Sequence, residues 1–467
     1  MVTTTLTLTA EHHALLHDHL FPDDGCEAVA LALCSHRAGT DRHRLMVREI
    51  VPIPYDACPV RLPDQVTWST DMLPAILERA AKRGHALVKI HGHRSFPQFS
   101  KTDDQSDRAL FPSVHGWLDD CEPHASVIMM ETGEMFGRVV DADGQFVPLA
   151  AINSVGDDLA FWRAEDRAKT DIPSHAHRVA QTFGRGTFEQ LRQLRIAVIG
   201  CSGTGSIVVE QLARNCVGSL LLVDPDVVEQ KNLNRIVNAT KTDAEAGRTK
   251  VDVLHDAILG MGLDTRVDTI AGTLFDAETV KAVAECDIVF GCMDSIDGRH
   301  LLNKLATFYL LPYFDLGVKL EADGKGGIDQ VCGTVHYLQP GGSSLLSRKV
   351  YTLAQVQAAG ISRTEPATYR AQVKEGYIKG VAEDRPAVIH VNAMVASLAI
   401  NELLARLHPF RIDPNGDYAI HRISLSHGIY EHDADGEPCP LLKKHVGRGD
   451  VHPLLEWAEL SAKAKAA

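Results

Sequence analysis

Three glycines, Gly200, Gly203 and Gly205, follow the apolar stretch at residues 196–199. A strand that ends in glycines and opens a helix brings free backbone N–H groups and the positive end of the helix dipole against phosphate. The missing side chains also let a ligand approach the backbone closely. Because the spacing is G-x-x-G-x-G rather than the G-x-G-x-x-G of dinucleotide-binding turns, the loop predicts a phosphate site and disfavours a nicotinamide-dependent dehydrogenase.

Polar residues that could complete a nucleotide site follow in order along the chain. Asp224 comes directly after the next apolar stretch, at residues 220–223, where its carboxylate can accept hydrogen bonds from ribose hydroxyls. Asn232, Arg235 and Lys250 then supply an amide and two cations. Such groups neutralise the charge that develops on phosphates during cleavage, so they favour a nucleoside triphosphate over a dinucleotide.

A further carboxylate, Asp294, follows the apolar stretch at residues 287–292. It is placed to hold Mg²⁺, a hard cation that prefers carboxylate and phosphate oxygens. Taken singly, each of these polar residues could equally be a solvated surface residue, and their occurrence together and in order carries the prediction. The sequence therefore predicts an ATP–Mg site.

These motifs resemble those of the ThiF and ubiquitin-activating-enzyme superfamily, over residues 178–407. The matching motifs are G-x-x-G-x-G from Gly200, D-P-D-x-V-E-x-x-N-L-N-R from Asp224, G-R-T-K ending at Lys250, and D-x-x-x-x-R from Asp294. The resemblance implies a Rossmann-like domain that adenylates the C-terminal Gly-Gly carboxylate of a ubiquitin-like protein and releases pyrophosphate.

The resemblance also implies roles for individual residues. Phosphate would be bound by Gly200, Gly203 and Gly205, ribose by Asp224, and the rest of ATP by Asp226, Asn232, Arg235 and Lys250. Catalysis would use Arg235, Lys250 and Asp294, of which Asp294 would hold Mg²⁺. Arg178 resembles the arginine that family members lend to the ATP of a neighbouring subunit, which implies a homodimer; the alternative is an ordinary helix-surface arginine.

Two features depart from this family pattern. The chain has ten cysteines but no C-x-x-C pair, and Pro340 is followed by Ser343 and Ser344 in the region where zinc-binding members carry cysteines, so no structural zinc is expected in this domain. No cysteine occurs between Cys332 and Cys439, so the crossover loop lacks a thioester-forming residue. Either Cys439 forms the thioester, or the adenylate transfers its acyl group directly to a partner.

A second cluster of chemically active residues lies near the amino terminus. His91 and His93 end an apolar stretch, and Asp103 follows within the length of a loop. Two imidazoles at i and i+2 on a strand point to one side, and with a carboxylate they form a three-ligand set that leaves one zinc position open for water. With 23 histidines in the chain, an H-x-H pair alone is weak support.

Together with Ser100-x-x-Asp103, this pair resembles the JAB/MPN (JAMM) metalloprotease family over the first 150 residues. The resemblance implies cleavage of peptide or isopeptide bonds after ubiquitin-like C-termini, with zinc held by His91, His93 and Asp103. Ser100 would help to hold the oxyanion, and Glu27 would be the general base and acid, with a strand-end salt bridge as its alternative role. The loop after His93 is one residue shorter than usual, Arg94 replaces a proline, and Asp104 could compete for the metal.

Several secondary-structure elements must position these residues. Residues 1–150 are expected to form a JAB/MPN-like α/β domain, residues 151–193 a helical linker and arm, and residues 194–467 a doubly wound adenylation domain. Within the last, apolar stretches at 196–199, 220–223, 267–270 and 288–290 alternate with helical segments. A long crossover loop is predicted at 341–384, then an amphipathic helix at 396–407 and a C-terminal tail.

Composition narrows the possible partners. The formal net charge of -14 and the lack of a Lys/Arg-rich block disfavour nucleic acid and anionic membranes. No apolar stretch approaches the roughly 20 residues that span a bilayer, and no basic segment precedes an apolar one at the start, which favours the cytoplasm.

The combined interpretation is a bifunctional enzyme of a bacterial-type ubiquitin-like conjugation system, with a Gly-Gly-ending modifier and a conjugating enzyme as partners and with ATP, Mg²⁺ and Zn²⁺ as cofactors. Two alternatives stay open. One is an adenylyltransferase for a sulfur-carrier protein with a precursor-trimming protease, and the other is a non-catalytic scaffold.

Overall fold

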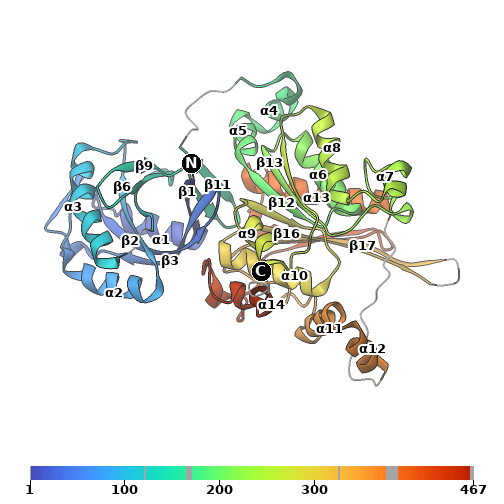
Figure 1. The fold of residues 1–467 in the computed structure, drawn as a ribbon. Coiled ribbons are helices and arrows are strands. Elements are labelled where there is room, and N and C mark those ends of the chain that lie inside the picture. The colour runs from blue at the N-terminus through green and yellow to red at the C-terminus, as the bar shows by residue number, and fades with distance from the viewer. Residues whose placement is uncertain are drawn as a thin grey trace. The chain divides into compact units, whose positions relative to one another are not determined.

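A computed structural model describes residues 2–119, 122–164, 171–323, 325, 327–374 and 388–462. The chain divides into two compact units (Figure 1). The first comprises Met1–Lys169 with the short segments Phe308–Leu310 and His445–Val451, and the second comprises the remaining chain. In the described ranges, no helix combines the length and the apolar character that crossing a bilayer requires.

The first unit is built on a mixed sheet. In order across the sheet, its strands are β11 (Leu159–Arg163), β10 (Ala151–Val155), β1 (Thr3–Thr9), β3 (Arg42–Pro52), β2 (Val29–Ala38), β6 (Ala86–His93), β7 (His124–Met130), β8 (Met135–Val140) and β9 (Phe146–Pro148). Its α-helices are α1 (Ala10–Leu20), α2 (Leu73–Arg83) and α3 (Lys101–Leu118) among the described residues.

Strand β2 shows why helices cover both faces of this sheet. Its residue Ala32 shares a core with Leu16 of α1. The next residue, Leu33, packs in a second core with Ile76 of α2 and Val114 of α3. Because successive side chains of a strand point to opposite faces, a continuously apolar strand needs cover on each side. Strands β2 and β6 therefore run through the middle of the sheet, and His91 and His93 lie at the carboxyl end of β6.

The domain boundary predicted at residue 150 is wrong. Strand β10 pairs in parallel with β1, with Ala151 opposite Thr5, and β11 pairs antiparallel with β10. All five residues of β10 are buried, so this segment completes the first sheet instead of starting a linker. The predicted helical arm begins later, with α4 (His177–Phe183) and α5 (Arg185–Gln193), and residues 165–170 lie outside the described chain.

The second unit contains another mixed sheet. Its strands, in order, are β14 (Arg266–Ile270), β13 (Ser219–Val223), β12 (Arg195–Ile199), β15 (Ile288–Gly291), β16 (Tyr313–Ala322), β17 (Ile328–Leu338), β18 (Ile420–Ser424) and β19 (Ile429–Asp433). The strands β14, β13, β12, β15 and β16 are parallel to their neighbours. The pairs β16–β17, β17–β18 and β18–β19 are antiparallel. The predicted α/β class is confirmed, and each of the four predicted apolar stretches lies within one of the strands β12 to β15.

Strand order in this unit identifies where a ligand can bind. The chain passes from β12 through α6 (Gly203–Arg214) to β13 on one side, whereas β15 lies on the other side of β12. In open parallel sheets a crevice forms outside the carboxyl ends of the strands where the order reverses in this way. The glycine loop follows β12 at this point, and α8 (Lys250–Met261) begins near it.

The predicted crossover loop is partly helical. It contains α11 (Leu353–Thr364) and α12 (Pro366–Lys374), and residues 375–387 lie outside the described chain. Thr352 and Gln355 form a capping box that starts α11, a local signal that the prediction overlooked. The predicted amphipathic helix belongs to a longer one, α13 (Ile389–Leu407), which packs against α6.

Candidate functional site

Each glycine of the loop after β12 is required by close contacts. Gly200 has a φ of +91°, and a Cβ there would lie 2.9 Å from the carbonyl carbon of Cys292. At Gly205 a Cβ would lie 1.8 Å from the carbonyl oxygen of Gly200, and at Gly203 it would lie 2.2 Å from Nδ2 of Asn392. Among the described residues no side chain caps the N-terminus of α6. The first turn of α6 therefore presents free N–H groups to a ligand, whereas the N–H groups of Gly200 and Cys201 are bonded to Val223 and Asp224.

Most of the predicted nucleotide-binding residues line one cavity of about 710 Å³. They are Gly200, Gly203, Asp224, Asp226, Asn232, Arg235, Lys250 and Asp294. Gly205 lies in the first turn of α6, behind the loop. A volume of this size is typical of small-molecule sites.

Asp224 organises the loop through its carboxylate. Its Oδ2 accepts a hydrogen bond of 2.7 Å from the backbone N–H of Cys201, and its Oδ1 accepts one of 2.9 Å from that of Asp226. Burial raises the pKa of Asp224, and the Lys250 ammonium opposes this effect. A carboxylate with two backbone donors is held firmly in place, so Asp224 connects the ends of β12 and β13.

Lys250 places a buried ammonium beside two carboxylates. Its Nζ lies 2.6 Å from Oδ2 of Asp226 and 3.5 Å from Oδ1 of Asp224. Thr249 caps α8 immediately before it, and the backbone N–H of Lys250 donates to the carbonyl of Asp226. Since Asp226 is largely exposed, a phosphate could replace it as the partner of the ammonium.

Asn232 ends the short helix Gln230–Asn232, Arg235 follows in a turn, and both residues line the cavity. Oδ1 of Asn232 accepts a hydrogen bond of 3.0 Å from the backbone N–H of Glu229, which leaves the amide NH₂ to face a ligand. Nη1 of Arg235 donates to the carbonyl of Lys231 at 3.0 Å, and the stem of the same side chain packs near Gly203.

Asp294 is exposed at the end of β15 and lines the cavity. Its carboxylate has no hydrogen bond or ion pair with any residue in the described ranges. Five residues after Asp294, Arg299 donates to buried Asp315 through two nitrogens, and this pairing raises the pKa of Arg299 above its ordinary value although burial lowers it. The arginine of the D-x-x-x-x-R motif therefore supports the cavity wall, whereas the aspartate is available to a metal ion.

Asn392, which lines the cavity from α13, was not among the residues predicted from the sequence. Its side chain is 1% exposed, and neither Nδ2 nor Oδ1 has a hydrogen-bond partner among the described residues. Leaving a buried amide unpaired costs about 1–3 kcal/mol, so an amide that lines a cavity without a partner is a candidate ligand contact. An asparagine among Val391, Val395 and Ala396 is the signal that could have indicated it.

Two predicted residues lie away from this cavity. Arg178 is exposed on α4 and does not line it. Cys439 is 1% exposed, and its backbone N–H donates to the carbonyl of Gly342. Its thiol is therefore inaccessible to a macromolecular carboxylate in this conformation.

The segment after Pro340 is tied down by polar contacts. Ser343 donates to the carboxylate of Asp435, and Arg348 donates to Asp435 at 2.8 Å, to Oγ of Ser343 at 2.7 Å and to the carbonyl of Tyr337 at 2.8 Å. These bonds connect two parts of the chain that are about 90 residues apart in sequence, at the place where relatives were expected to use cysteines.

In the first unit, the five predicted residues Glu27, His91, His93, Ser100 and Asp103 line one cavity of about 320 Å³. Nε2 of His91 lies 3.1 Å from Nε2 of His93 and 3.1 Å from Oδ1 of Asp103. Nε2 of His93 lies 3.8 Å from Oδ2 of Asp103. Ligand atoms of a tetrahedral zinc ion are about 3.3 Å apart when each lies at 2.0–2.1 Å from the metal, so this donor set fits zinc.

Local structure explains how the ligands meet. His91 and His93 end β6 on one face, and Asp103 is the third residue of α3. Ser100 caps that helix: its Oγ accepts from the N–H of Asp103 at 3.1 Å, and its own N–H donates to Oδ2 of Asp103 at 2.6 Å. The predicted competitor Asp104 instead accepts from Arg138 at 2.5 Å.

Glu27 faces the same cavity with an altered acidity. Burial, and then the carboxylates of Asp103 and Asp64, raise its pKa to about 8. Its Oε1 lies 3.9 Å from Nε2 of His93. A carboxyl group with a pKa near neutrality can both accept and return a proton, which general acid–base chemistry requires.

A model of the ThiF family matches residues 175–431. Ubiquitin-like modifier-activating enzyme 5 of Drosophila persimilis is 28% identical over 205 residues, which are 41% of this chain and 50% of that protein. The protein of the same name from Arabidopsis thaliana is 28% identical over 169 residues, which are 33% of this chain and 37% of that protein. The chain thus spans half or less of the length of these relatives.

Among solved structures, E. coli MccB with ATP is 18% identical, with a TM-score of 0.43. The similarity covers 58% of this chain and 74% of that chain. The complex of MccB with N-formylated MccA is 19% identical, with a TM-score of 0.45, and covers 59% of this chain and 77% of that chain.

Proposed function

Because the chain belongs to the ThiF family, we propose that its second unit adenylates the C-terminal carboxylate of a ubiquitin-like protein ending in Gly-Gly. The observation that carries the proposal is the single cavity that gathers the glycine loop, Lys250, Asn232, Arg235 and Asp294. A multiply charged phosphate chain is the ligand that this combination of backbone N–H groups, cations and a free carboxylate matches best.

In the proposed reaction, a carboxylate oxygen of the modifier attacks the α-phosphorus of ATP. The bond from that phosphorus to the oxygen bridging to the β-phosphate breaks, and pyrophosphate leaves with the electron pair. Negative charge grows on the leaving group, so Lys250 and Arg235 stabilise the transition state more than the ground state. Asp294 would hold Mg²⁺, which supplies further positive charge to the phosphate oxygens.

ATP–pyrophosphate exchange, measured with a panel of ubiquitin-like proteins that end in Gly-Gly, tests this proposal. We expect exchange only with a matching partner, and a loss of at least about 100-fold in Asp294→Asn. The control is Asp413→Asn, which removes an acid that does not line the cavity. Exchange that continues at full rate in Asp294→Asn would remove the assigned metal role, and no exchange with any partner would favour a scaffold.

We further propose that the first unit hydrolyses peptide or isopeptide bonds after the same kind of tail. Five residues predicted from sequence converge on its cavity, and three of them fit zinc. When bound, zinc polarises the scissile carbonyl and activates water. Glu27, with its pKa near 8, would take a proton and deliver it to the leaving amine. Ser100 orients Asp103 through the helix cap.

Cleavage of a linear fusion that follows a Gly-Gly tail tests the second proposal. We expect Glu27→Gln to retain zinc, measured by mass spectrometry, and to lose at least about 100-fold in cleavage rate. Glu11→Gln, which changes an exposed acid of the same unit, is the control. Unchanged cleavage in Glu27→Gln would exclude the general-base role.

A further inference from the structure

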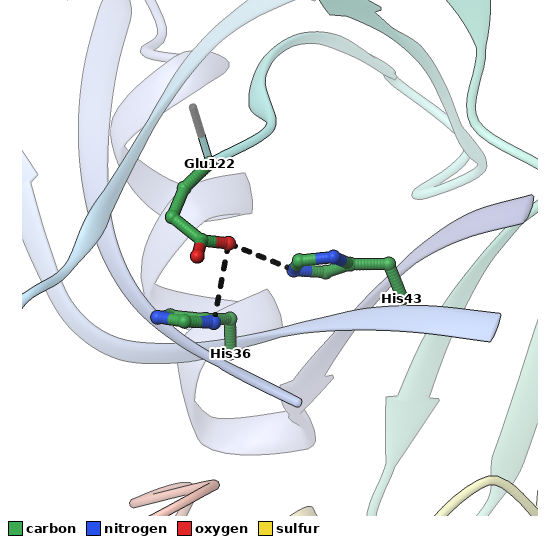
Figure 2. A group of neighbouring side chains, drawn as sticks. All are labelled: His36, His43 and Glu122. Carbon is green, nitrogen blue, oxygen red and sulfur yellow. Dashed lines mark ion pairs between the residues drawn. The ribbon is translucent and has the colours of Figure 1, made fainter. Parts of the chain in front are cut away.

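A second group of histidines in the first unit lies outside the cavity described above. His36 of β2, His43 of β3 and Glu122, which precedes β7, point toward one another (Figure 2). Nδ1 of His36 lies 3.3 Å from Oε2 of Glu122, and Nε2 of His43 lies 3.4 Å from the same oxygen. The two imidazole rings stack with their centroids 5.6 Å apart.

The hairpin of β2 and β3 explains why the two rings meet. In its antiparallel register, His36 is opposite Leu45 and Ala38 is opposite His43. His43 is two residues from Leu45, so the two histidines lie on the same face as diagonal neighbours. Glu122 approaches that face from the segment before β7. Three parts of the unit therefore contribute one side chain each.

The separations match a metal site. A tetrahedral ion with ligands at 2.0–2.1 Å keeps its ligand atoms about 3.3 Å apart, close to the two distances measured to Glu122. Two imidazoles and one carboxylate form a set that binds zinc and leaves a fourth position for water. The side chains of His36 and Glu122 are 25% and 33% exposed, so an ion can reach the group from solvent.

The imidazole nitrogens that face Glu122 are available to a metal ion. Nδ1 of His36 and Nε2 of His43 are both buried, and neither has a hydrogen-bond partner among the described residues although each faces the Glu122 oxygen. Neutral imidazole nitrogens with free lone pairs are the form that binds metals.

We propose that His36, His43 and Glu122 form a binding site for zinc, separate from the His91 cavity. Strand β2 carries the two sites at opposite ends, since Val29 pairs with His91 and His36 lies seven residues further on. At about 3.3 Å per residue, the sites are about 23 Å apart. A zinc ion here would fasten the β2–β3 hairpin to the segment before β7 and so stabilise the sheet that positions the catalytic cavity.

Zinc stoichiometry of the full-length chain tests the proposal. The protein is stripped with a chelator, reloaded with ZnCl₂, dialysed and measured by plasma mass spectrometry. The double variant His91→Ala/His93→Ala serves as the background, because it removes the other candidate site. We expect this background to keep about one zinc ion per chain and to lose it when Glu122→Gln or His43→Ala is added. Added His12→Ala, which changes a half-buried histidine of the same unit, should keep the ion.

The background variant makes a failure of this proposal distinguishable from a failure of the proposed hydrolase activity. If the His91 cavity holds no zinc, the wild-type chain and the background bind the same amount, and the effect of Glu122→Gln is unchanged. A background that binds no zinc, or one whose zinc survives both Glu122→Gln and His43→Ala, would overturn the proposal. Cobalt loading provides a second readout, since visible absorption reports tetrahedral coordination even when a variant is less stable. Loss of that absorption in Glu122→Gln is expected, and its retention would also overturn the assignment.

Discussion

The nucleotide cavity of the second unit and the histidine cavity of the first unit differ in how their charged and polar side chains are arranged. In the second unit the Lys250 ammonium is paired with Asp224 and Asp226, while Asp294 has no partner among the described residues and no side chain caps α6. In the first unit, imidazoles and carboxylates crowd together, and the pKa of Glu27 rises to about 8 through burial and the neighbouring acids. The nucleotide cavity therefore suits an anion with several charges, and the histidine cavity suits a cation.

The largest effect is expected where the backbone itself binds the ligand. A Cβ at Gly205 would lie 1.8 Å from the carbonyl oxygen of Gly200, so Gly205→Ala must distort the loop. We expect the variant to lose ATP binding by calorimetry and about 1–3 kcal/mol of stability. Gly260→Ala is the matched control, because that helical glycine has open space around it and alanine favours helix. Equal ATP affinity in both variants would contradict the assigned phosphate loop.

Removal of the proposed zinc ligands in the first unit should separate the two proposed activities. We expect His91→Ala/His93→Ala to lose cleavage of a Gly-Gly fusion by about 1,000-fold or more, because the metal is essential to this chemistry. ATP–pyrophosphate exchange by the same protein should stay within about twofold of wild type, since the two cavities belong to separate units and share no lining residue. A parallel fall in exchange would show that the two cavities are coupled.

Lys250 offers a smaller but more specific test of the paired charges. Lys250→Met keeps most of the side-chain volume and removes the ammonium, so exchange should fall by about 100-fold through kcat. Lys241→Met is the control, because Lys241 also begins a helix but is 74% exposed. If Lys250→Met changed only stability, the ammonium would be a structural partner of Asp226 alone.

A substitution of Asn392 tests whether its buried amide, which has no partner among the described residues, binds ATP. Asn392→Leu removes both polar atoms with little change of volume, so stability should be retained or rise, because an unpaired amide costs about 1–3 kcal/mol. We expect the KM for ATP to rise about tenfold, the value of one lost hydrogen bond to a charged group. Asn401→Leu, on the exposed side of the same helix, should leave the KM unchanged. A lower stability without a KM effect would assign Asn392 to packing.

The residues of the nucleotide cavity differ in how well the sequence predicts them, because some lie near the short motifs and one lies far from them in sequence. Asp224 and Asp294 follow apolar stretches, and the carboxyl ends of neighbouring parallel strands share one edge, so their meeting with Gly200 follows from the pattern. Asn392 comes from a helix about 100 residues after Asp294, and only tertiary packing brings it to the loop. The short motifs therefore predicted the strand-end residues and missed the helix.

The same distinction explains the corrected elements. Strand β10 belongs to the first sheet because it pairs with β1, about 150 residues earlier, and nothing local in Ala151–Val155 indicates that partner. The capping box of Thr352 is local, and it could have predicted α11 inside the supposed loop. Similarly, the His36 and His43 pair becomes visible only once the register of the hairpin is known.

The smallest effect is expected at Cys439. A substitution there distinguishes a thioester on Cys439 from direct transfer of the acyl group from the adenylate. Its thiol is 1% exposed and does not line the nucleotide cavity. If the adenylate passes its acyl group directly to a partner, Cys439→Ala should leave exchange and product formation within about twofold of wild type, apart from a modest loss of stability from the lost sulfur. Cys286→Ala, at another buried thiol, controls for that loss. Selective loss of product in Cys439→Ala, with exchange intact, would mean that the segment opens and that the thioester route operates.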